Sequence, residues 1–161
     1  MFNIGDKVVY PMHGAGVIES IEEKEMHGSK RSYYVMNMPL GEMKVMIPMD
    51  NACQVGLREV IDSGEVEQVY SVLREPCEAN GDNWNRRYTA NLEKIKTGNI
   101  LEIAEVVKNL VHRKNEKGLS AGEKKMLDSA HKLLVSELVL VEGIETTQVD
   151  EIIEGLVVKV R

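Results

Sequence analysis

The sequence contains few of the residues that build disulfide-rich or metal-bound proteins. Among 161 residues there are two cysteines, Cys53 and Cys77, and they stand apart without the spacing of a zinc or redox motif. Both are therefore interpreted as small packing residues in a protein of a reducing compartment. We expect no bound metal and no cofactor.

Long apolar runs and an N-terminal basic-then-apolar segment are also missing. Their absence predicts no membrane contact and a cytoplasmic location. The sequence has no phosphate-cradling glycine motif or helicase signature, and its histidines (His13, His27, His112 and His131) are scattered. An enzyme needs converging acid, base, nucleophile or metal ligands, so we do not expect an enzyme.

The charge of the chain is acidic overall but unevenly distributed. The net charge is -6, and 43% of the residues are hydrophobic, which suits one folded domain or two small ones. Residues 82–141 carry eleven Lys or Arg and eight Asp or Glu, a local charge of +3. This middle region can hold a phosphate-binding face on an acidic protein, although mixed charge on helices is commonly a solvated surface.

The first part of the chain has the pattern of a small β domain. Short β-branched and Met-rich runs at 7–10, 17–21, 32–38 and 43–47 are separated by glycines and prolines. Short strands of this kind bury a core best by closing on themselves, which predicts a compact barrel over residues 1–61. Met36, Met38, Met43, Met46 and Met49 fit either an irregular core or an adaptable partner-binding patch.

From residue 62 the hydrophobic period changes to that of helices, and residues 62–161 are predicted to form a compact helical bundle. Asp62 and Ser120 each stand three residues before a glutamate, as in capping boxes. Gly98 and Gly118 are expected to end helices. The fold class is thus α+β, with an all-α second part.

The segment 81–88 (GDNWNRRY) holds the sole tryptophan, followed by paired arginines. Trp84 and Tyr88 share one helical face with Leu92 and Ile95, which favours a buried core stripe. Asp82 as N-cap, however, places Trp84 in the first turn, where its ring can project beyond the core. An aromatic wedge beside Arg86 and Arg87 is the alternative, and it fits DNA.

Two basic groups accompany this stretch. Lys94 and Lys96 follow Arg86 and Arg87 on one helix, and Lys124 and Lys125 lie in the first turns of the helix after Ser120, with Lys132 further along it. Helix N-termini favour a phosphate, so a surface that binds DNA backbone is the functional hypothesis. Ordinary solvated lysines are the alternative.

Five separated motifs resemble the CarD/CdnL family of bacterial transcription regulators. They are, in chain order, 8–14 (VVYPMHG), 46–48 (MIP), 55–58 (VGLR), 84–88 (WNRRY) and 118–124 (GLSAGEK). The resemblance runs almost end to end. It implies a Tudor-like N-terminal domain, shared with transcription-repair coupling factors, that binds the β subunit of RNA polymerase, and a helical domain that reaches promoter DNA.

The resemblance also implies roles for particular residues. Trp84 corresponds to a tryptophan that wedges into the minor groove at the upstream edge of the transcription bubble. Arg86 and Arg87 match the adjacent basic pair, and Lys124, next to Lys125, matches a second DNA-facing segment.

The polymerase-binding residues follow from the same comparison. Lys24 matches a basic contact position, and Lys44 lies close to Met46 on one strand. Met46 stands where some relatives carry arginine, so apolar contact or pairing of an exposed strand edge would replace that arginine's contacts.

The expected function is a monomeric transcription regulator that docks on RNA polymerase, associates with the nucleoid through it, and stabilises the open complex. A protein-protein adaptor without DNA contact, with Trp84 in the core, is the alternative.

Overall fold

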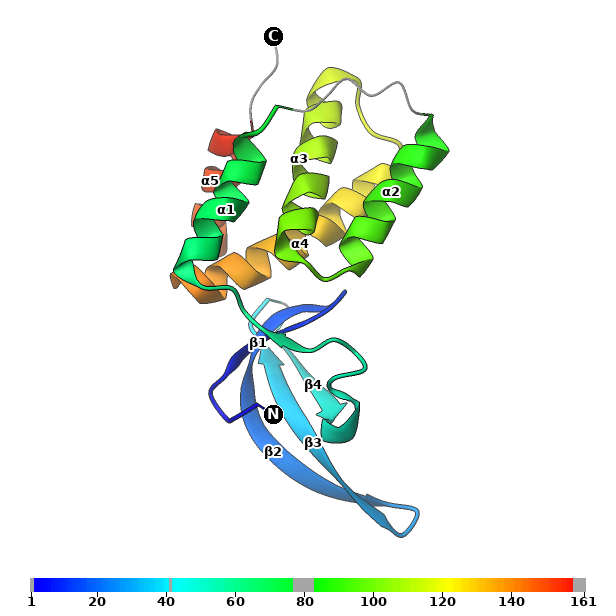
Figure 1. The fold of residues 1–161 in the computed structure, drawn as a ribbon, viewed down its shortest axis with the longest axis vertical. Helices are drawn as coiled ribbons and strands as arrows, with labels where there is room; N and C mark the ends of the chain where they lie inside the picture. Colours follow the sequence, from blue (N-terminus) through cyan, green and yellow to red (C-terminus); the bar gives the residue numbers. More distant parts are fainter. Residues whose placement is uncertain (1, 41, 77–82, 158–161) are drawn as a thin grey trace.

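The computed structural model describes residues 2–40, 42–76 and 83–157. Strands come first and helices follow, as two stacked parts along the long axis of the molecule (Figure 1). This confirms the predicted α+β class, with a small β domain followed by an all-α part. The expected linker at 77–82, including Cys77, lies outside the described residues.

The β part is a five-stranded antiparallel sheet in the order β4-β3-β2-β1-β5. Its strands are β1 (Lys7–Tyr10), β2 (Gly14–Met26), β3 (Ser29–Met38), β4 (Met43–Pro48) and β5 (Arg58–Glu59), with a 3-10 turn, η1 (Met49–Asn51), before β5. The sheet curves around an apolar core made of Val8, Ile18, Tyr34, Met36, Met38, Ile47, Ala52 and Leu57.

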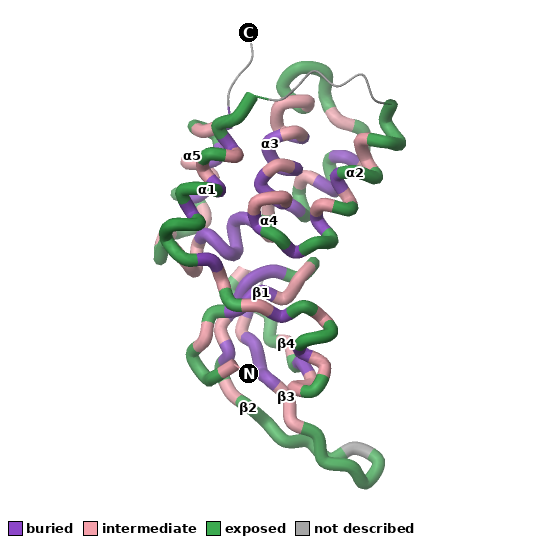
Figure 2. Tube along the Cα trace, in the orientation of Figure 1, coloured by how far each residue is buried: buried purple, intermediate pink, exposed green. Residues whose placement is uncertain are grey.

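Strands β2 and β3 are longer than the hydrophobic pattern predicts. They extend as a hairpin past the other strands, and its outer part is exposed (Figure 2). The extension ends in a two-residue turn with His27 at φ 52° and Gly28 at φ 78°. Two positive φ values suit the twist of a hairpin. The turn and the backbone hydrogen bonds between β2 and β3 therefore hold these charged strand ends together, although they have no apolar face to bury.

The described residues of the second part form five helices: α1 (Ser63–Arg74), α2 (Trp84–Lys96), α3 (Ile100–Glu116), α4 (Ala121–Glu142) and α5 (Thr146–Leu156). The full Ser120–Glu123 capping box is present, and Asp62 accepts the Glu65 N–H at 2.9 Å. The predicted helix-ending glycines Gly98 and Gly118 both have positive φ. None of the described helices has the length and apolarity needed to cross a bilayer.

Helix α4 joins the bundle to the sheet. Ser136 Oγ accepts the buried backbone N–H of Ala15 at 3.0 Å, and Lys7 Nζ donates to the Leu140 carbonyl at 3.1 Å. Gly14 has φ +120°, and a Cβ there would lie 3.1 Å from Ser136 Oγ. Glycine is therefore required at residue 14 both by conformation and by the close approach of α4.

A buried ion pair completes this junction. The Glu137 side chain is only 2% exposed and accepts two guanidinium hydrogen bonds from Arg58, at 2.7 and 2.8 Å. It also accepts the Ile61 backbone N–H at 2.9 Å, while Arg58 Nη2 donates to the Gly98 carbonyl at 2.9 Å. Arg58 thus connects β5 to α4 and to the end of α2, so the pair fixes how the sheet sits on the bundle.

Replacing Glu137→Ala is expected to lower the free energy of unfolding by about 2–4 kcal/mol, because Arg58 and the Ile61 N–H lose their partner in a buried place. Urea unfolding followed by circular dichroism measures this. Asp50→Ala is the matched control, since it removes the exposed Arg31–Asp50 pair, whose attraction is screened by solvent, and it should change the stability far less than Glu137→Ala. Equal costs for the two variants would show that the buried pair does not hold the junction.

Candidate nucleic-acid interface

Trp84 is the first residue of α2 and lies at the surface. The N-cap is Asn83, whose side chain accepts the Arg86 N–H at 2.9 Å, so the prediction that Asp82 is the cap was wrong by one residue. Asn and Asp cap helices about equally well, and the sequence offers both in succession. The shift places Trp84 at the very start of the helix.

The exposed fraction of Trp84 decides between the two interpretations of its stripe. Ile95 is buried, and Tyr88 and Leu92 pack partly against the helical core, whereas Trp84 is 40% exposed. The stripe is thus a core stripe for its last three members. Trp84 extends beyond it, because the first turn of α2 reaches past the end of the core.

Although exposed, the Trp84 ring is held on several sides. Its Nε1 donates to Ser120 Oγ at 3.0 Å and to Glu123 Oε1 at 3.2 Å. Its ring stacks on Tyr88, with centroids 4.9 Å apart and planes inclined by 18°. Gly122 lies against both rings, since a Cβ there would be 3.5 Å from Tyr88 and 3.6 Å from Trp84.

These contacts bring the first turns of α2 and α4 side by side. Lys124 and Lys125 on α4 are exposed, as is Arg86 on α2, and Arg87 is half-buried. The two helix N-termini add partial positive charge where these four basic residues lie. The structure therefore gathers all five residues predicted to contact DNA, although their contact with DNA stays a prediction.

Lys94 and Lys96, two further basic residues of the predicted surface, lie beside acidic side chains. Lys94 Nζ pairs with Glu105 at 2.9 Å, and Lys96 Nζ lies 4.0 Å from Glu93. Both side chains therefore balance acidic neighbours on the helices. Lys132, the third such residue, is exposed further along α4.

The residues predicted to bind polymerase share one face of the sheet. The register pairs Met46 with Val35 and Val35 with Ser20, and side chains alternate along each strand. Lys44 and Met46 on β4 therefore lie on the same face as Lys24 on β2. Lys44 Nζ pairs with Glu19 at 3.2 Å, and Met46 is 36% exposed on an edge strand.

On the same face, directly across from Lys24, Arg31 Nη2 donates to Asp50 Oδ1 at 2.9 Å. The hydrogen bond that the Arg31 guanidinium donates to Asp50 raises the pKa of Arg31.

The methionines divide between the two interpretations left open by the sequence. Met36 and Met38 are fully buried in the β core, and Met49 packs partly against it. Met43 and Met46 are exposed. Gap-filling explains the first group, and the second adds adaptable apolar surface to β4.

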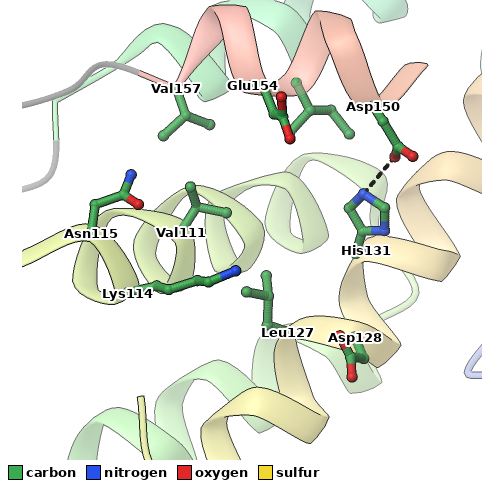
Figure 3. A pocket seen from close by; sticks show the side chains of 10 residues that line it. Val111, Lys114, Asn115, Leu127, Asp128, His131, Asp150, Glu154 and Val157 are labelled. Carbon is green, nitrogen blue, oxygen red and sulfur yellow. Dashed lines mark ion pairs between the residues drawn. The ribbon is translucent and has the colours of Figure 1, made fainter. Parts of the chain in front are cut away.

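A pocket of about 510 Å³ between α3, α4 and α5 is a second candidate functional site, apart from the surface around Trp84 (Figure 3). Its lining includes Lys114 and Asp128, and His131 Nε2 lies 2.8 Å from Asp150 Oδ1. No group of three metal-ligating side chains occurs among the described residues. The His131–Asp150 pair links α4 to α5, and we assign no chemistry to it.

Sequence reasoning missed the partners that anchor Trp84. Ser120 and Glu123 were recognised as a helix cap, but their bonds to the indole cross 36 and 39 residues of chain. Arg113, whose Nε lies 3.8 Å from the buried Glu123 carboxylate, was also missed. A local pattern carries no signal for such contacts.

The fold and this surface define a class of protein: a small β module joined rigidly to a helical bundle that presents an anchored tryptophan among basic first turns. The chain belongs to the CarD family. The family model described as the CarD-like/TRCF RID domain matches residues 2–61, and the one described as the CarD C-terminal domain matches residues 68–154.

A full-length relative agrees with this assignment. The chain is 46% identical over 149 residues to the putative transcription factor YdeB of Bacillus subtilis (strain 168), covering 92% of this chain and 97% of that protein. It is also 30% identical to the 72-residue N-terminal domain of Myxococcus xanthus CarD, solved by NMR. That match covers 37% of this chain and 79% of the domain, with a TM-score of 0.32.

Proposed function

We propose that this protein docks on the β subunit of bacterial RNA polymerase and stabilises the promoter open complex by contacting DNA at the upstream edge of the bubble. The observation that carries the proposal is the anchored, 40% exposed Trp84 between the basic first turns of α2 and α4. Family membership and a relative described as a putative transcription factor support a role in transcription.

The division of labour follows the chain. Residues 1–61 form the polymerase-docking domain and residues 62–161 the DNA-contacting domain. Docking uses the sheet face that carries Lys24, Lys44 and Met46. The protein acts as a monomer and is located with the nucleoid through the polymerase.

The mechanism requires binding energy and no chemistry. The Trp84 ring wedges at the fork while Arg86, Arg87, Lys124 and Lys125 neutralise phosphates. A wedge that binds the open complex more tightly than the closed one by about 1.4 kcal/mol shifts their equilibrium about tenfold. Docking raises the effective concentration at the fork, so the affinity of the isolated protein for DNA can be weak.

The contacts proposed here read DNA shape and deformability instead of base identity. The same stabilisation helps initiation at an unstable promoter and slows escape at a stable one.

The proposal predicts that the wild-type protein lengthens the open-complex lifetime on a promoter and that Trp84→Ala does not. The measurement is the decay of heparin-resistant complexes formed with bacterial RNA polymerase. Trp84→Ala must remain folded and bound to polymerase, which far-UV circular dichroism and co-purification check. A folded, bound variant that acts like wild type would favour the adaptor function instead.

Replacing Arg86→Ala and Arg87→Ala together should weaken binding to free duplex DNA and reduce the slope of log K against log salt by about one to two, because each phosphate contact releases counterions. Fluorescence anisotropy of labelled DNA at several salt concentrations measures the slope. The control is Lys30→Ala on the β2–β3 hairpin, which should leave the slope unchanged. An unchanged slope in the double variant would exclude the two arginines as phosphate contacts.

Met46→Asp should weaken binding to the polymerase β subunit at least about tenfold, since it places an uncompensated charge in the proposed contact. Met43→Asp is the matched control, because Met43 is also exposed on β4 but alternates to the other face. Biolayer interferometry with immobilised polymerase compares the two. Equal losses, or loss only with Met43→Asp, would contradict the assigned face.

A further inference from the structure

We infer that Glu123 and Ser120 are positioning residues that clamp the Trp84 indole in the orientation used at the DNA fork. This inference rests on the proposed function and adds the source of the wedge's rigidity. The clamp is the capping box of α4, which thereby serves a second purpose besides starting that helix.

The indole N–H of Trp84 has acceptors within the protein. An exposed tryptophan at a helix end can give its N–H to water, so it needs no protein acceptor. Trp84 nevertheless has two, Ser120 Oγ at 3.0 Å and Glu123 Oε1 at 3.2 Å. The Ser120 hydroxyl in turn donates to Glu123 Oε1 at 3.2 Å, so its oxygen can accept both the Glu123 backbone N–H, at 3.2 Å, and the indole N–H.

The Glu123 side chain that accepts the indole N–H is buried. The third residue of a capping box can do its work at the surface, yet Glu123 is only 2% exposed. Its Oε2 lies 3.8 Å from Arg113 Nε, so the buried charge has a cationic neighbour. A carboxylate in this place accepts a stronger hydrogen bond from the indole N–H than a neutral group or water would. The hydrogen bond from the indole and the nearby charge of Arg113 offset part of the energetic cost of burying the carboxylate.

The contacts of the Trp84 ring determine which part of its surface stays exposed. One face of the indole stacks on Tyr88, and the Nε1 edge lies against α4. The exposed surface of Trp84 must therefore come from the other ring face and the opposite edge. A ring already fixed this way loses little rotamer freedom on entering a base step, whereas a loose ring loses more.

The experiment uses the full-length protein and the fact that Trp84 is the sole tryptophan. Acrylamide quenching and anisotropy of its fluorescence report on the clamp without DNA. Open-complex lifetime with RNA polymerase reports on function. Far-UV circular dichroism confirms that each variant is folded.

Glu123→Ala tests the clamp, and Gln148→Ala is its matched control. Gln148 holds the same third position in the capping box of α5, which has no tryptophan, so it measures the cost of losing a box alone. Glu123→Gln keeps an acceptor oxygen and a good capping residue. Ser120→Ala removes one indole acceptor while leaving Glu123, and it serves as the second variant if Glu123→Ala does not fold.

We expect Glu123→Ala to raise the quenching constant about twofold, lower the anisotropy, and reduce the lifetime gain roughly three- to tenfold. Ser120→Ala should show the same changes more weakly. Glu123→Gln should recover most of both signals, and Gln148→Ala should match wild type in both.

Unchanged quenching and anisotropy in folded Glu123→Ala and Ser120→Ala would overturn the clamp. Changed fluorescence with a wild-type lifetime gain would overturn its role at the fork. If wild type itself gives no lifetime gain, the proposed function fails, and the fluorescence series alone still decides whether Glu123 and Ser120 hold the ring.

Discussion

The buried Arg58–Glu137 pair is the interaction on which the rest of the structure depends. It joins β5 to α4, and through the Gly98 carbonyl it also reaches the end of α2. Helix α4 carries Glu137 near one end and Glu123 near the other, fourteen residues or roughly 21 Å apart. One helix therefore connects the sheet to the tryptophan, and the direction in which Trp84 points is set relative to the sheet.

In the proposed function, this connection explains how an acidic protein can be directed to DNA. With a net charge of -6 the chain has no general attraction for nucleic acid, and the basic residues assigned to DNA lie in the first turns of α2 and α4. In the proposed function, docking by the sheet supplies the local concentration, and α4 aims the ring. The exposed hairpin and the first turn of α2 lie at opposite ends of the molecule, with the buried junction between them (Figure 2).

The parts of the fold that depend on neighbours in the sequence were predictable. The Ser120–Glu123 box, the Asp62 cap and the glycine stops at Gly98 and Gly118 are local, and each was found where expected. The lengths of β2 and β3 were not, because their outer halves are held by a turn and a ladder instead of a hydrophobic pattern. The exposure of Trp84 and the Arg58–Glu137 pair depend on partners 36 to 79 residues away, which no spacing rule reveals.

The most direct test of the proposed Trp84 wedge is a crosslink between promoter DNA and Trp84 in the open complex. Promoters carrying 5-iodouracil at successive positions across the bubble would be irradiated with polymerase and this protein, and the crosslinked peptide identified by mass spectrometry. We predict a crosslink to Trp84 from positions at the upstream edge and from none inside the bubble. Polymerase-bound protein that yields no crosslink to Trp84 at any position would contradict it.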